Sequence, residues 1–74
     1  MRTSLYLKVE AQPGSTIQNA LKDALHIADL LLTTVEFDFN GVTCLIKPNA
    51  DIELAEARWN DMLGSKREYK IISA

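Results

Sequence analysis

Histidine and cysteine are the side chains of this sequence best suited to nucleophilic or metal chemistry, and each occurs once, as His26 and Cys44. A general base or a metal site needs partners at fixed spacing, and His26 has only Asp23 and Asp29 nearby on the same predicted helix. One cysteine is too few for a closed structural zinc site. We therefore predict an exposed histidine, a buried and inert thiol, and no metal.

Four acidic residues, Asp51, Glu53, Glu56 and Asp61, cluster near a second predicted helix. A carboxylate pair that performs acid–base chemistry needs both groups in one cleft with separated pKa values. Here Asp51 and Glu53 have the positions of helix-start residues, where a negative charge suits the helix dipole, and Asp61 falls on the outer surface. The sequence contains no glycine-rich phosphate loop and no nucleophile motif, so we expect no enzyme activity, cofactor or small-molecule ligand.

The composition indicates one small globular domain over residues 1–74. The formal net charge of −2 is unfavourable for nucleic-acid binding, which depends on neutralising phosphates with lysine and arginine. A lone cysteine excludes an intrachain disulfide and suggests a reducing compartment. No apolar run has the length of a signal peptide or a membrane span, so we expect a cytoplasmic location.

A β-hairpin over Val35–Lys47 is the most strongly specified element. Asn40-Gly41 predicts a two-residue type I′ turn, because both central residues of that turn need positive φ. The turn and the period-2 pattern specify the same register, which gathers apolar residues on one face. These residues are Val35, Phe37, Phe39, Val42, Cys44 and Ile46.

One strand and one helix are predicted before the hairpin. Residues 4–11 alternate apolar and polar, with Leu5, Leu7, Val9 and Ala11 on one side, which is typical of a half-buried strand. Ser15 and Gln18 match a capping box at the start of a helix. Its apolar stripe is made of Ile17, Leu21, Ala24, Leu25, Ala28, Leu31 and Leu32.

A second helix follows Pro48, with Asn49 or Asp51 as its N-cap and Gly64 as a C′ residue. Its inner face is predicted to contain Ile52, Ala55, Trp59, Met62 and Leu63. Trp59 is expected to be a core anchor, with a binding hot spot as the alternative. Residues 65–74 form either an edge strand or a flexible tail.

These elements predict an α+β fold with the ferredoxin-like split βαβ order, βαββα with a possible fourth strand. In that architecture two helices cover one face of an antiparallel sheet and the other face is open to solvent. Without the fourth strand, the same elements give a three-stranded sheet with both helices on one side.

Leu5-Tyr6-Leu7 resembles the start of the first-strand motif of RNA-recognition-motif domains, in which an aromatic side chain stacks on a base. The family's second motif needs basic and aromatic residues on the third strand, where this chain has Gly41-Val42-Thr43-Cys44-Leu45-Ile46. Single-stranded nucleic-acid binding by the open sheet face, or by Lys66, Arg67 and Lys70, is therefore the alternative function.

Phe39-Asn40-Gly41-Val42-Thr43, followed by Lys47-Pro48, an acidic helix start and Arg58-Trp59, resembles small uncharacterised bacteriophage and prophage proteins. The resemblance covers about half of the chain and implies a genomic setting without an activity.

The preferred hypothesis is a non-enzymatic protein-interaction module, phage- or prophage-like, that binds a protein partner or forms a homodimer. Apolar side chains left over after the core is assigned motivate it, because such residues are candidates for contact with another protein. They are Tyr6 and Leu45 on the open sheet face, Leu30 and Leu54 on outer helix faces, and Ile72 in the tail.

Overall fold

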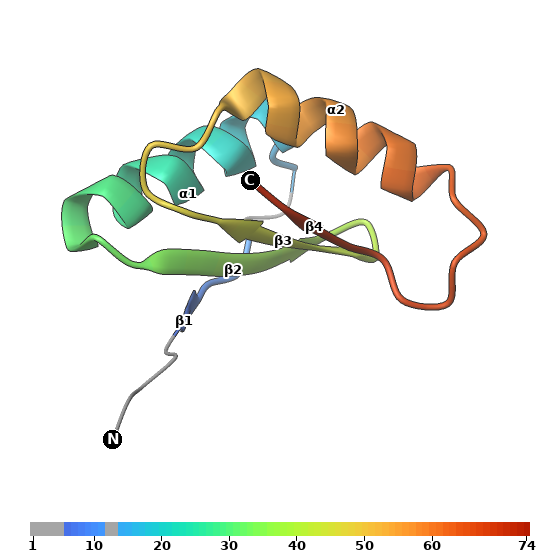
Figure 1. Ribbon diagram of the computed structural model, residues 1–74, viewed down its shortest axis with the longest axis horizontal. Helices are drawn as coiled ribbons and strands as arrows, with labels where there is room; N and C mark the ends of the chain where they lie inside the picture. The colour runs from blue at the N-terminus through green and yellow to red at the C-terminus, as the bar shows by residue number, and fades with distance from the viewer. Residues whose placement is uncertain (1–5, 12–13) are drawn as a thin grey trace.

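The computed structural model describes residues 6–11 and 14–74 and shows an α+β chain of two helices and four strands. The elements are β1 (Tyr6–Lys8), α1 (Ile17–Leu31), β2 (Thr34–Phe39), β3 (Val42–Ile46), α2 (Ile52–Leu63) and β4 (Ile71–Ser73). Both helices lie on one face of the sheet, as predicted, and the other face is open (Figure 1). The first strand is shorter than expected, and residues 4 and 5 lie outside the described part of the chain.

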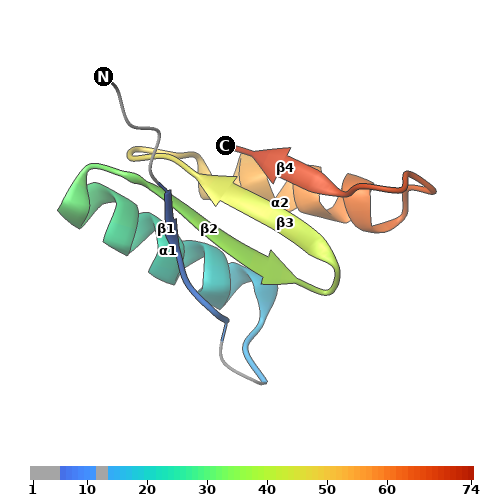
Figure 2. The same cartoon turned by 90° about the horizontal axis from the view of Figure 1, so that it is seen from below.

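The four strands form one mixed sheet in the order β1-β2-β3-β4 (Figure 2). The prediction of an antiparallel sheet is correct for β2 and β3 but wrong for the outer pairs, because β1 runs parallel to β2 and β4 runs parallel to β3. Each outer pair is joined through a helix, and a helical crossover returns the chain in the same direction. The paired strands are neighbours, so the βαβ units are not split as they are in the ferredoxin-like order.

The hairpin between the two βαβ units reverses the strand direction while both helices stay on one face (Figures 1 and 2). The two crossovers therefore have opposite hands, and one of them is the rare left-handed form.

The hairpin has the predicted register. Val35 pairs with Ile46, Phe37 with Cys44, and Phe39 with Val42. Asn40 and Gly41 have φ values of 51° and 82°, as a type I′ turn requires. All of the predicted inner-face residues are buried except Phe39, which is half-buried. Helix residues complete the core, with Leu21 and Ala28 from α1 and Trp59 from α2, so Trp59 is confirmed as a core residue.

Helix ends differ from the prediction in three places. The N-cap of α1 is Thr16, whose Oγ1 accepts a hydrogen bond from the Asn19 amide at 3.1 Å, and not Ser15. The helix ends in a left-handed residue that is not glycine, Leu32, with φ 53°. Gly64 ends α2 with φ −83°, so it uses no conformation that only glycine favours. The predicted alternative Asp51 is the N-cap of α2 and accepts from two helix amides.

Candidate interaction surface

The two helices divide the sheet between them. α1 packs on β2 and β3, and α2 packs on β3 and β4, whereas β1 makes its closest backbone contacts with β2. Figure 2, seen from the open side of the sheet, shows α1 passing behind β1. Leu7 pairs with buried Val35 and so lies on the helix-facing side of the sheet, yet 37% of its surface is exposed.

The two flanks of α1 have different surroundings. One flank faces α2: Gln18 donates to the Glu56 carboxylate at 3.2 Å, and the Asp29 carboxylate accepts from the Asn49 amide at 2.7 Å. The opposite flank carries Asp23 and Ile27, which line a cleft shared with residues 9–11. That flank therefore faces β1 and the segment that follows it.

Leu30 extends the β1-facing flank, because it lies three residues after Ile27 and seven after Asp23. It is 72% exposed, as expected from the sequence. Leu31 was expected in the core, but it is 56% exposed. Leu31 is the last residue of α1, three positions beyond Ala28, which is the last buried residue of the helix.

Leu32 was also expected in the core, and it is 81% exposed. The cause is its left-handed backbone, which ends the helix and takes the side chain out of the apolar stripe.

We give the name β1 flank to a set of partly or largely exposed apolar residues along β1 and on the side of α1 that faces away from α2. It consists of Leu7, Val9, Ile27, Leu30 and Leu31. Leu7 belongs to β1 and Val9 follows its last residue, while Leu30 and Leu31 lie three and four residues after Ile27 on α1. Sequence periodicity could find Leu30, but the surface as a whole depends on the position of β1 relative to α1.

The cleft at one end of the β1 flank has a volume of about 210 Å³. Its floor and walls are mostly apolar and include Phe37, Ala20 and Ala24, while Glu10, Ser15 and Asp23 add polar groups. This volume is below the range of about 300–1,000 Å³ typical of ligand pockets. The cleft therefore fits a protein side chain better than a whole small molecule.

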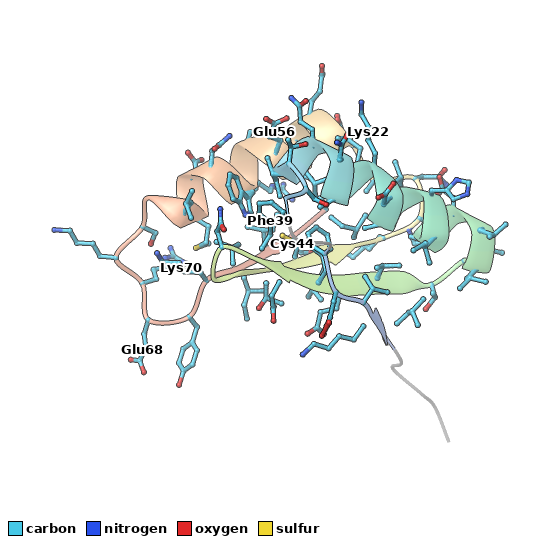
Figure 3. All side chains as sticks on the ribbon, turned by 180° about the vertical axis from the view of Figure 1, so that it is seen from behind. Lys22, Phe39, Cys44, Glu56, Glu68 and Lys70 are labelled. Atoms are coloured by element: carbon cyan, nitrogen blue, oxygen red, sulfur yellow. The ribbon has the colours of Figure 1, made fainter. Side chains whose placement is uncertain are left out.

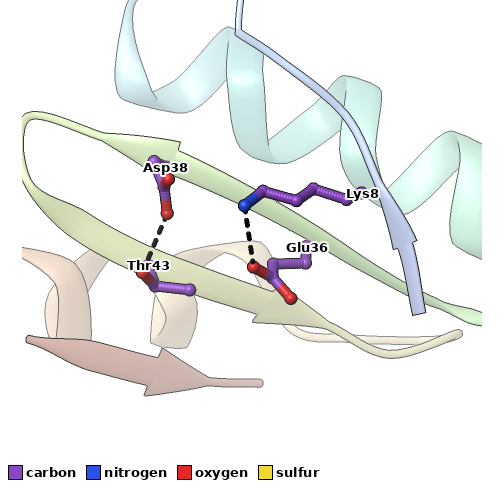
Figure 4. Close-up of polar contacts among 4 residues, drawn as sticks. All are labelled: Lys8, Glu36, Asp38 and Thr43. Carbon is purple, nitrogen blue, oxygen red and sulfur yellow. Dashed lines mark hydrogen bonds and ion pairs between the residues drawn. The ribbon is translucent and has the colours of Figure 1, made fainter. Parts of the chain in front are cut away.

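The open face of the sheet is mainly polar. Lys8 Nζ lies 3.7 Å from a Glu36 carboxylate oxygen, and the Thr43 hydroxyl donates to the Asp38 carboxylate at 2.8 Å (Figure 4). Leu45 is half-buried on this face, in the row of Lys8, Glu36 and Ser73.

Leu45 does not have the predicted neighbour. In the backbone register Tyr6 on β1 pairs with Thr34 on β2, whereas Leu45 on β3 pairs with Glu36 on β2. Tyr6 and Leu45 are therefore separated by a strand and lie at different positions along the sheet. The apolar residue nearest to Leu45 in the register is Ile71 of β4, which pairs with Thr43 and is 53% exposed. The backbone positions of Tyr6 and Leu45 do not adjoin, and the side chain of Tyr6 lies outside the described part of the structure.

The other two residues predicted for the interaction surface, Leu54 and Ile72, also lie away from the β1 flank. Leu54 is 44% exposed on α2, away from the β1 flank. Ile72 is only 4% exposed, so the expectation that it lies outside the core is wrong. The reason is that residues 71–73 form β4, and the Cα of Ile72 pairs with Cys44 in the middle of the sheet. Of the candidates whose side chains are described, Leu30 alone lies on the β1 flank.

The two residues best suited to chemistry lie apart from each other. His26 is exposed on α1, whereas Cys44 is fully buried beneath the helices (Figure 3). Burial and the nearby Asp38 charge raise the pKa of the Cys44 thiol to about 12. Over residues 6–11 and 14–74, no three histidine, cysteine or acidic residues form a group that could hold a metal ion.

Neither of the described helices has the length and apolar character that a membrane span requires. Comparison of the chain with protein-family models, with curated proteins and with solved structures gave no match. The resemblance of residues 39–43 and the segments after them to phage proteins therefore stays a prediction.

Proposed function

We propose that this chain is a non-enzymatic protein-interaction module that binds another protein chain through the β1 flank. The observation that supports this most strongly is the exposure of two neighbouring leucines at the end of α1, Leu30 and Leu31, at 72% and 56%. Contiguous exposed apolar side chains on a small domain are typical of protein-interaction sites.

The surroundings of the flank favour a macromolecular partner. Its apolar residues are bordered by the carboxylates of Glu10 and Asp23, which gives the arrangement of an apolar centre with a polar rim. The acidic border also disfavours nucleic acid, whose phosphates it would repel.

The test compares two pairs of substitutions in the full chain. Leu30→Glu with Leu31→Glu places charge in the flank, and Leu54→Glu with Ile71→Glu does the same at exposed apolar sites elsewhere. We expect sedimentation and affinity capture to show self-association or partner binding by the native chain, loss of this binding in the first variant, and retention in the second. Equal binding by both variants, or the absence of any bound protein with the native chain, would overturn the proposal.

A further inference from the structure

We infer that the partner at the β1 flank inserts a basic side chain, a lysine or an arginine, into the cleft between α1 and residues 9–11. The inference rests on the proposed function and specifies the chemistry of its partner. The cleft shares Val9 and Ile27 with the β1 flank, so a chain bound to the flank can reach into it.

Two small residues of α1 give the cleft its shape. Ala20 and Ala24 are about one helical turn apart and both are buried, so their side chains leave room between the helix and the segment that follows β1. Figure 2 shows α1 passing behind this segment. Phe37, which is 1% exposed, lines the cleft from the sheet. A cleft of about 210 Å³ with these apolar walls suits the methylene stem of one long side chain.

The charge at the cleft favours a cationic end on that side chain. Glu10 and Asp23 line the cleft and are exposed, and its lining contains no lysine or arginine within residues 6–11 and 14–74. Lysine and arginine carry a cation on an apolar stem. Such a side chain can place its stem against the alanines and Phe37 and its charge beside the two carboxylates.

Two lysines that are close to these acids in the sequence lie elsewhere. Lys8 Nζ is 3.7 Å from a Glu36 carboxylate oxygen on the open face of the sheet, whereas the cleft is on the helix side (Figure 4). Lys22 follows Gln18 by four residues, and Gln18 is on the flank of α1 that faces α2. Neither lysine therefore supplies the cation from within the chain.

The size of the cleft favours a protein side chain over a free small molecule, because the volume is below the usual range of ligand pockets. Protein interfaces commonly obtain much of their affinity from one anchor side chain in a pocket, surrounded by weaker contacts, and arginine is enriched among such anchors. The exposed apolar residues of the β1 flank would provide the surrounding contacts.

Short blocked peptides test the cleft directly. The probes are acetyl-glycyl-arginyl-glycine amide and its lysyl analogue, and the controls have norleucine or glutamate at the central position. We expect the two basic peptides to shift the methyl NMR signals of Ala20, Ala24 and Ile27 saturably at millimolar concentration, and the two controls to shift them far less.

Removal of the two charges identifies the groups that recognise the cation. Asp23→Asn with Glu10→Gln keeps the shape of both side chains, and we expect the basic peptides to bind this variant about fivefold or more weakly than the native chain. Asp61→Asn with Glu68→Gln makes the same chemical changes at exposed sites elsewhere, and should bind like the native chain.

The absence of saturable shifts with both basic peptides, or native affinity in the Asp23→Asn and Glu10→Gln variant, would overturn the inference. Equal binding of the norleucine peptide would identify an apolar occupant, and much tighter binding of n-propylguanidine than of the arginyl peptide would identify a small free cation. Either result also contradicts the inference.

The same variant separates this inference from the proposed function. If a captured protein binds it with native affinity but is lost with Leu30→Glu and Leu31→Glu, the basic-anchor inference fails and the proposed function stands. If the basic peptides bind the cleft but the two leucine changes leave partner binding intact, the cleft stands and the proposed function fails.

Discussion

The indole Nε1 of Trp59 donates a hydrogen bond to the backbone carbonyl of Phe39 at 3.2 Å, and the two rings meet edge to face with centroids 5.7 Å apart. This contact fastens α2 to the end of the central hairpin. Because Trp59 is 6% exposed and its polar atom is paired, it contributes both burial and orientation to the core.

Replacement of Trp59 separates these two contributions. We expect Trp59→Phe to lower the free energy of unfolding by about 1–2 kcal/mol through the lost hydrogen bond and volume, and Trp59→Ala to lower it by about 3–5 kcal/mol. Urea titration followed by circular dichroism measures both variants. A loss below about 1 kcal/mol for the alanine variant would contradict the core position of this ring.

The N-cap of α1 gives a second test, because sequence and structure select neighbouring residues. We expect Thr16→Ala to destabilise the chain by about 1 kcal/mol, since its hydroxyl accepts from the Asn19 amide, and Ser15→Ala to have little effect. The same urea titration distinguishes the two, and a larger loss for Ser15→Ala would restore the capping box that the sequence predicts.

The thiol of Cys44 gives a dependence on pH. Its pKa is raised from 9.0 to about 12 in the folded chain, mainly by burial and also by the Asp38 charge. Between pH 9 and 12 the unfolded chain therefore loses a proton that the folded chain keeps, and stability falls as the pH rises through this window.

Urea titrations at alkaline pH measure this slope, and Cys44→Ala is the control. Since that variant lacks the thiol, its stability should fall less steeply than that of the native chain over the same window. We also expect Cys44 in the native chain to react with a thiol reagent only as fast as the chain unfolds. Rapid labelling of the folded chain at neutral pH would contradict its buried position.

Local patterns predicted the elements that depend on neighbouring residues. Asn40-Gly41 and the alternating apolar positions around it were sufficient to define the hairpin register, and Asp51 was among the predicted helix caps. The direction and order of the outer strands could not be predicted in this way. The pairing of β1 with β2 and of β4 with β3 depends on the path of each crossover helix, which no local residue pattern determines.

The candidate surface shows the same limit. Leu30 could be found because it lies off the apolar stripe of its helix, but Leu31 lies on the stripe and is nevertheless exposed at the last position of α1. The prediction for Ile72 was wrong in the opposite sense, because this residue was expected outside the core but lies in the three-residue strand β4, which buries it beside Cys44. Exposure in both cases is decided by contacts between distant segments.

Methyl NMR of leucine-labelled chain, recorded across a dilution series and with any captured partner added, tests the role of the β1 flank most directly. We expect the methyl signals of Leu7, Leu30 and Leu31 to shift on association, while those of Leu45 and Leu54 stay in place. Shifts confined to Leu45 or Leu54, or unchanged spectra under both conditions, would contradict an interaction module that acts through the β1 flank.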